Sequence, residues 1–305
     1  MKNWIIGILV LVVVGGIGYF LMTNGSKSSE PVNQEQATST TGAQTATTTT
    51  TTAAQENSGQ TVIGKSVEGR DIIAYHFGTG PEEILLIGGI HGGYEWNTTY
   101  LANTLVDYFP KNSKLIPGNL NITIIPTMNI DGFAKIADGQ YLGDAPIFTA
   151  ASSAQLTEAR FNANTVDLNR NFDCNWQASG VWQNKKVSGG SAPFSEPESQ
   201  AIKNYIEANH PKAVVVYYSA AGGVYSSSCG NGILPETKAL TSLYAKASGY
   251  KAYDKFDAYQ TSGDMVDWLA KINIPAISVL LTNHTDIELD KNLAGVKAVF
   301  AKYAK

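Results

Sequence analysis

Five strand-length apolar runs alternate with helical patterns along most of this 305-residue chain. The runs are rich in β-branched residues, and several are apolar throughout, which is typical of central strands covered on both faces. The expected strands are Asp71–Phe77, Glu83–Ile90, Asn121–Thr127, Ala213–Ser219 and Ala276–Thr282. The expected helices are Glu95–Phe109, Glu196–Ala208, Glu236–Ser248, Gly263–Lys271 and Glu288–Tyr303. This alternation predicts a three-layer α/β/α domain around a central mixed sheet, over residues 60–305.

The N-terminal region differs in composition from this domain. Trp4–Met22 carries no charge, and a helix of that length spans ~28 Å, about one hydrocarbon core. Residues 1–22 are therefore expected to be a signal-anchor transmembrane helix, with a cleaved secretory signal as the alternative. Residues 23–59 contain no aromatic residue and are rich in threonine, which predicts a disordered linker. Since Lys2 precedes the apolar run, the domain is expected on the extracytoplasmic side of the membrane.

Charge and cysteine content exclude several classes of protein. The net charge is −4, which argues against a nucleic-acid-binding protein, because such proteins usually carry a basic excess. Cys174 and Cys229 are the only two cysteines, too few for a cysteine-rich zinc module. In an exported domain they could form one disulfide, and two unrelated buried thiols are the alternative.

Residues that directly follow the expected strands are candidate ligands, because α/β folds bind ligands at the carboxyl ends of their strands. His91 and Glu95 follow the strand Glu83–Ile90, and this pair of side chains suits a divalent metal such as zinc. Arg170 lies between two asparagines and could hold a carboxylate through two hydrogen bonds. A structural salt bridge is the alternative role for this arginine.

Several segments, in this order along the chain, resemble the zinc carboxypeptidase family, the family of carboxypeptidases A and B. They are Gly64–Arg70, Gly88–Gly92, Arg160–Phe172, Pro193–Glu198 and Tyr259–Trp268. The resemblance implies an enzyme that removes the C-terminal residue of a peptide. In that reaction zinc polarises the scissile carbonyl and activates a water molecule, and a glutamate moves the proton.

The resemblance also implies a role for individual residues of this chain. His91 and Glu95 would bind zinc, and Asn169 and Arg170 would hold the terminal carboxylate of the substrate. The remaining roles fall to Arg160, which would face the oxyanion, to Tyr259, which would close over the substrate, and to Val266, which would form the floor of the specificity pocket. The implied substrates are peptides, including cell-wall peptides if the source is bacterial.

Three departures from the family pattern affect its chemistry. The family has two residues between its first two ligands, whereas three separate His91 from Glu95. Tyr218 stands where the family has its other zinc-binding histidine, and a phenol with a pKa of about 10 is a poor zinc ligand. The catalytic glutamate is replaced by a leucine, either Leu280 or Leu281.

Other residues could take over the lost roles. Tyr218 itself or His284 could be the third ligand, His284 could instead be a base, and Asp264 could supply a carboxylate. The alternative for the last two is a loop histidine and an acid at a helix N-terminus. Three functions therefore remain. The first is a membrane-anchored zinc metallocarboxypeptidase-like hydrolase with a divergent metal site. The others are a non-catalytic homologue that binds peptide C-terminal carboxylates, and an amidohydrolase acting on small acylated amino acids.

Overall fold

The computed structural model describes residues 59–137, 151–230 and 232–305. Its strands are β1 Gly59–Lys65, β2 Asp71–Gly78, β3 Glu82–Ile87, β4 Leu120–Ile125, β5 Ser179–Trp182, β6 Lys185–Ser188, β7 Ala213–Ser219, β8 Gly223–Ser226, β9 Lys251–Tyr253 and β10 Ala276–Leu281. Its α-helices are α1 Trp96–Lys111, α2 Ile130–Ala137, α3 Ser153–Glu158, α4 Pro197–Asn209, α5 Pro235–Ser248, α6 Met265–Lys271 and α7 Leu289–Tyr303.

The expected membrane helix and linker lie outside the described residues, apart from Gly59 at the start of β1. Within the described ranges, no helix is both long enough and apolar enough to cross a membrane.

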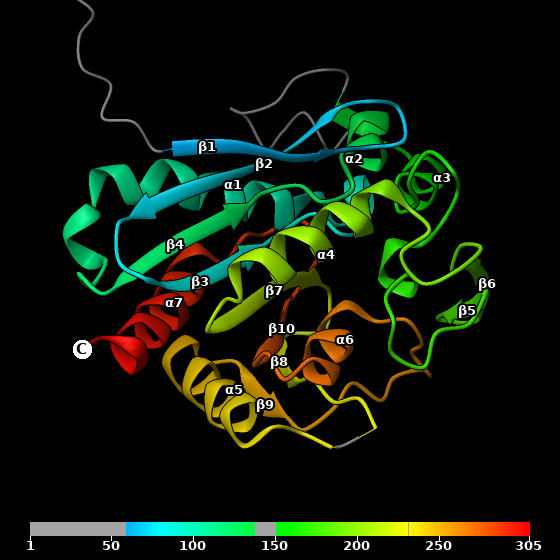
Figure 1. The fold of residues 1–305 in the computed structure, drawn as a ribbon. Coiled ribbons are helices and arrows are strands. Elements are labelled where there is room, and N and C mark those ends of the chain that lie inside the picture. Colours follow the sequence, from blue (N-terminus) through cyan, green and yellow to red (C-terminus); the bar gives the residue numbers. More distant parts are fainter. Residues whose placement is uncertain (1–58, 138–150, 231) are drawn as a thin grey trace, which may run out of the picture. The chain divides into compact units, whose positions relative to one another are not determined.

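The described strands build an eight-stranded sheet in the order β1-β2-β4-β3-β7-β10-β8-β9, with β5 and β6 forming a separate hairpin (Figure 1). The central strands β4, β3, β7 and β10 run parallel, whereas the pairs β1–β2, β2–β4 and β10–β8 are antiparallel. The sheet is therefore mixed, as the sequence predicted. Because β3, β7 and β10 are parallel and adjacent, the segments that follow them meet at one edge of the sheet.

Helices cover both faces of the sheet, which gives the three layers expected from the alternating pattern. Apolar residues of α1, α5 and α7 pack in the core on one face, and those of α4 and α6 pack in the core on the other face. The central strands are buried on both sides, and all seven residues of β7 and all six of β10 are buried. This double burial explains why these strands read as continuous apolar runs.

The pairing of β7 with β10 decides which side chains face the same layer. Leu280 lies opposite Tyr218 in the parallel ladder, and both side chains belong to the core on the side of α4 and α6. Leu281 points the other way, into the core beneath α1, α5 and α7. Leu280 is therefore the leucine that shares a face with Tyr218.

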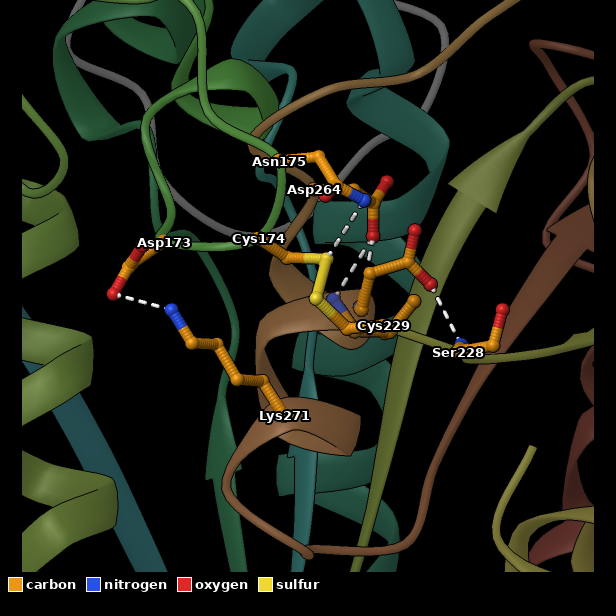
Figure 2. Close-up of a disulfide and its surroundings, with 9 residues drawn as sticks. Asp173, Cys174, Asn175, Ser228, Cys229, Asp264 and Lys271 are labelled. Atoms are coloured by element: carbon orange, nitrogen blue, oxygen red, sulfur yellow. Dashed lines mark hydrogen bonds and ion pairs between the residues drawn. A yellow bond between two sulfur atoms is a disulfide. The ribbon is translucent and has the colours of Figure 1, made fainter. Parts of the chain in front are cut away.

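A disulfide joins Cys174 to Cys229, with 6.0 Å between the two Cα atoms (Figure 2). It connects the loop that follows the Asn169–Arg170 segment to the loop that follows β8. Backbone bonds reinforce this junction, because Gly263 N–H donates to the Cys174 carbonyl and Phe172 N–H donates to the Gly263 carbonyl. The segment expected to bind a carboxylate and the start of α6 are thereby held together.

Candidate active-site cavity

A cavity of about 570 Å³ opens at the sheet edge where β3, β7 and β10 end. Most of the residues singled out in the sequence line it, from segments far apart in the chain. They are His91, Glu95, Asn169, Arg170, Tyr218, Tyr259, Asp264, Val266, Leu280 and His284. Arg160 is not among the lining residues. The volume of the cavity suits a small ligand or the end of a peptide.

The turn between β3 and α1 brings His91 and Glu95 together despite the additional residue between them. Gly92–Glu95 forms a 3₁₀ turn, and α1 begins only at Trp96. Glycine is required at Gly92, which has a φ of +48°, because a Cβ there would lie 2.5 Å from the Ala159 carbonyl oxygen. As a result His91 Nδ1 lies 2.9 Å from Glu95 Oε1, and both side chains are buried.

Arg160 lies behind this pair, in a buried ionic cluster. Its Nε and Nη2 donate to Asp167 Oδ2 at 3.1 and 2.9 Å, and Nη2 lies 2.8 Å from His91 Nε2. Its guanidinium also stacks on Trp182, 4.4 Å from the ring centroid. Burial alone would raise the pKa of Asp167, but the charges of Arg160 and Arg170 hold that pKa at about 2. The structure thus places Arg160 where it positions His91 and neutralises Asp167.

The carboxylate-binding candidates lie at the cavity wall with several of their polar atoms already bonded. Arg170 donates from Nε and Nη2 to the Val181 carbonyl, and from Nη1 to the carbonyl of Asn169. Asn169 Nδ2 donates to Asp264 Oδ2 at 2.7 Å. The ring of Tyr259 lies beside Arg170, with 5.8 Å between the ring centroid and the guanidinium carbon.

Tyr218 and Leu280 are residues that the resemblance sets against a zinc ligand and the catalytic base of the family, with Leu281 as the alternative to Leu280. The Tyr218 hydroxyl lies 3.4 Å from Asn169 Oδ1, and burial raises the pKa of this phenol well above its ordinary value. Tyr218 is therefore a neutral group at neutral pH. Leu280 lines the cavity and can neither bind a metal nor move a proton.

The replacement candidates also border the cavity. His284 Nδ1 lies 2.8 Å from Ser219 Oγ, and burial lowers the pKa of His284. The Asp264 side chain caps the N-terminus of α6 by accepting hydrogen bonds from the backbone N–H groups of Val266 and Asp267. This is the structural role of an acid at a helix N-terminus, which was the alternative expected from the sequence. Val266 is 4% exposed and lines the same cavity as Asp264.

The zinc expected from the resemblance can be tested against the donor atoms present. His91 Nδ1 and Glu95 Oε2 are buried without a hydrogen bond; the 2.9 Å between Nδ1 and Oε1 is a close approach without hydrogen-bond alignment. Two such orphaned atoms suit a metal. A catalytic zinc, however, needs three protein ligands. Among the residues that the structure describes, no three His, Cys, Asp or Glu side chains form a metal-binding group. The described donors therefore do not fit the family's zinc.

The sequence did not point to a second carboxylate at this site, Asp267. It accepts a hydrogen bond from Ser228 N and lines the cavity with Asp264. Burial, followed by the charge of Asp264, raises the pKa of Asp267 to about 8. Asp167 was also overlooked, although it lies inside the segment that carried the resemblance. Its contact with Arg160 spans seven residues, which a motif alone does not reveal.

Stability should fall as the pH rises through the titration range of Asp267. The folded protein keeps a proton on this carboxyl that the unfolded chain releases, between the ordinary pKa of 3.8 and about 8. Asp267→Asn should flatten this slope and stabilise the protein most at pH 8, which urea unfolding at several pH values measures. Asp257→Asn, at an exposed position, is the control. Equal slopes in wild type and Asp267→Asn would contradict the assignment.

The sequence model of the zinc carboxypeptidase family matches residues 45–292. Carboxypeptidase O of Bos taurus is 26% identical over 227 residues, covering 64% of this chain and 56% of that relative. An inactive metallocarboxypeptidase, ecm14, of Sclerotinia sclerotiorum is 31% identical over 170 residues, covering 48% of this chain and 27% of that protein.

Among solved structures, the murein-tripeptide amidase MpaA from Escherichia coli O157 superposes with a TM-score of 0.57 at 22% identity. The superposition covers 81% of this chain and 93% of that structure, and it shows a shared fold. The chain spans little more than half the length of carboxypeptidase O. The family's named relatives include peptidases and an inactive homologue, so membership leaves the enzymatic status of a given chain open. With the family model matched over most of its length, this chain belongs to the zinc carboxypeptidase family.

Proposed function

We propose that this domain binds peptides by their C-terminal carboxylate and does not carry out zinc-dependent hydrolysis. The observation that carries the proposal is the pairing of Tyr218 with Leu280 across the β7–β10 ladder, at the cavity wall. Losing a general base typically costs about 10²–10⁴ in rate. Losing one of three protein ligands also weakens metal binding. The zinc reaction would therefore lack both a metal ligand and its general base.

The binding part of the site supports the proposal, because Asn169, Arg170 and Tyr259 all line the cavity. Arg170 uses Nε, Nη1 and Nη2 on backbone carbonyls, but a guanidinium has five N–H donors. Asp264 and Asp267 would repel a carboxylate if both were ionised. Burial raises the pKa of each, so the pair retains a proton near neutral pH and repels a bound carboxylate less than two ionised acids would.

The ligands that we propose are free peptide tails, including the peptides of bacterial cell walls. The same fold occurs in a protein named as a murein-tripeptide amidase, which supports that substrate class. The curated relatives include one named as an inactive metallocarboxypeptidase, which supports a role without zinc-dependent catalysis.

Calorimetry with one peptide in two forms tests this function. The free-acid peptide should bind at least about tenfold more tightly than its C-terminal amide, because charge-assisted hydrogen bonds contribute about 1.5–3 kcal/mol each. Arg170→Ala should remove the preference. The comparison of acid with amide needs no substitution, so it tests the proposal even if that variant does not fold. Equal affinities would refute recognition of the carboxylate, and zinc-dependent cleavage by the wild type would refute the absence of zinc-dependent hydrolysis.

We also propose that Trp4–Met22 anchors the protein in a membrane and places the domain outside the cytoplasm. The Cys174–Cys229 disulfide supports this, because disulfides persist mainly in oxidising compartments. The native protein should sediment with membranes, and protease should release a soluble fragment by cutting in the threonine-rich stretch. Identification of a mature N-terminus beyond residue 22 would overturn the anchor.

A further inference from the structure

The cavity contains a serine and a histidine whose side chains lie next to each other, Ser219 and His284. Ser219 ends β7, and its Oγ lies 2.8 Å from Nδ1 of His284, which lies in the loop between β10 and α7. Both residues line the cavity, and Ser219 is 8% exposed. A nucleophile activated by a base requires this hydrogen-bonding distance between the two side chains.

Contacts with Tyr94 and Asn97 hold the pair in place. The ring of Tyr94 packs against the His284 ring at 4.8 Å between centroids. Asn97 Nδ2 donates to the carbonyls of Asn283 and Asp286, which fixes the loop that carries His284. With its amide oriented in this way, Asn97 Oδ1 lies 3.1 Å from Ser219 Oγ. Asn97 is therefore a positioning residue for both members of the pair.

We propose that Ser219 is a nucleophile, that His284 is its general base, and that the pair transfers acyl groups from ester or amide substrates without a metal. Ser219 Oγ forms a bond to the carbonyl carbon as its proton passes to His284 Nδ1. The bond to the leaving group then breaks, and the leaving alcohol or amine takes up that proton. Water hydrolyses the resulting acyl-serine, which releases the acid and restores the serine hydroxyl.

The position of one proton decides whether the pair is reactive. The Ser219 hydroxyl has a single proton and two neighbouring acceptors, His284 Nδ1 and Asn97 Oδ1. The shorter contact is the one to His284, and the tautomer protonated on Nε2 leaves Nδ1 free to accept. In the opposite arrangement, Nδ1 donates to Ser219, the hydroxyl points to Asn97, and the serine is inert.

A fluorophosphonate probe distinguishes these arrangements, since reaction forms a bond from Oγ to phosphorus and expels fluoride. In the full-length wild-type protein, one probe should attach, peptide mapping should locate it at Ser219, and a metal chelator should not prevent it. His284→Gln retains a polar side chain but no base, so it should slow labelling by about 100-fold or more. Ser219→Ala should abolish labelling.

Ser278 supplies the matched control. It is also 8% exposed and lines the same cavity, but no hydrogen bond joins it to a histidine among the described residues. Ser278→Ala should be labelled like the wild type. Absence of labelling in the wild type, labelling at Ser278, or an unchanged rate in His284→Gln would each overturn the proposal. Failure of this test leaves peptide binding untouched, because the calorimetry does not depend on Ser219 reacting.

Discussion

A double variant, Tyr218→His with Leu280→Glu, should bind one zinc ion per domain and remove C-terminal residues at least about 100-fold faster than the wild type. The two side chains lie side by side on one face of the β7–β10 ladder and both line the cavity, so one imidazole and one carboxylate would enter the same space. His91 Nδ1 and Glu95 Oε2 are already buried there without hydrogen bonds. Mass spectrometry of the metal content and cleavage of a short peptide measure the two outcomes.

The controls for this variant follow from the strand register. Leu281 faces the opposite core, so Tyr218→His with Leu281→Glu should destabilise the domain and restore no activity. Each single change should do much less than the pair, because groups that act as a unit are strongly non-additive. A wild-type domain that already binds zinc stoichiometrically and cleaves peptides would contradict the whole interpretation of Tyr218 and Leu280.

Asp167→Ala should lower the free energy of unfolding by about 3–5 kcal/mol, because it removes the carboxylate that is hydrogen-bonded to the buried guanidinium of Arg160. The side chains of Arg160 and Asp167 are 1% and 0% exposed. Asp173 offers a comparison within the same loop region, since it pairs with Lys271 while both side chains remain 47% exposed (Figure 2). Asp173→Ala should therefore cost only about 0–1 kcal/mol.

Urea unfolding at pH 7 measures both variants under identical conditions. The low pKa of Asp167, about 2, also predicts that its contribution persists above pH 4 and is lost only as the pH falls towards 2. Similar losses for the two variants would mean that Asp167 does not hold Arg160 as we describe.

The layers and the central strands could be predicted from sequence because their physical signal is local. Ala213–Ser219 was predicted with the bounds that the structure gives to β7. The short strands β8 and β9 were missed, since four and three residues carry too little pattern to distinguish strand from loop. The β5–β6 hairpin was missed because it lies inside a stretch rich in Gly, Ser and Asn, which indicates loop.

Most of the candidate residues that line the cavity could be named from the sequence, whereas their contacts could not. Leu280 could not be separated from Leu281, because a strand buried on both faces shows no alternation, and only the register with Tyr218 distinguishes them. The hydrogen bond from Asn169 to Asp264 joins residues 95 positions apart, and the contact between Ser219 Oγ and Asn97 Oδ1 joins residues 122 positions apart. Such contacts arise from the tertiary fold and leave no trace in local spacing.

The pairing of Tyr218 with Leu280 also bears on the evolutionary reversibility of this site. A chain that regained the glutamate first would bury a carboxylate beside a neutral phenol, and an uncompensated buried charge costs several kcal/mol. A chain that regained the histidine first would gain a ligand but no base, with little activity for selection to favour. Neither single substitution improves the protein. The Tyr218–Leu280 pair therefore hinders stepwise evolution towards a zinc site. Descendants of this chain would then diverge as binding proteins, or acquire a different chemistry in the same cavity, more readily than they would return to zinc.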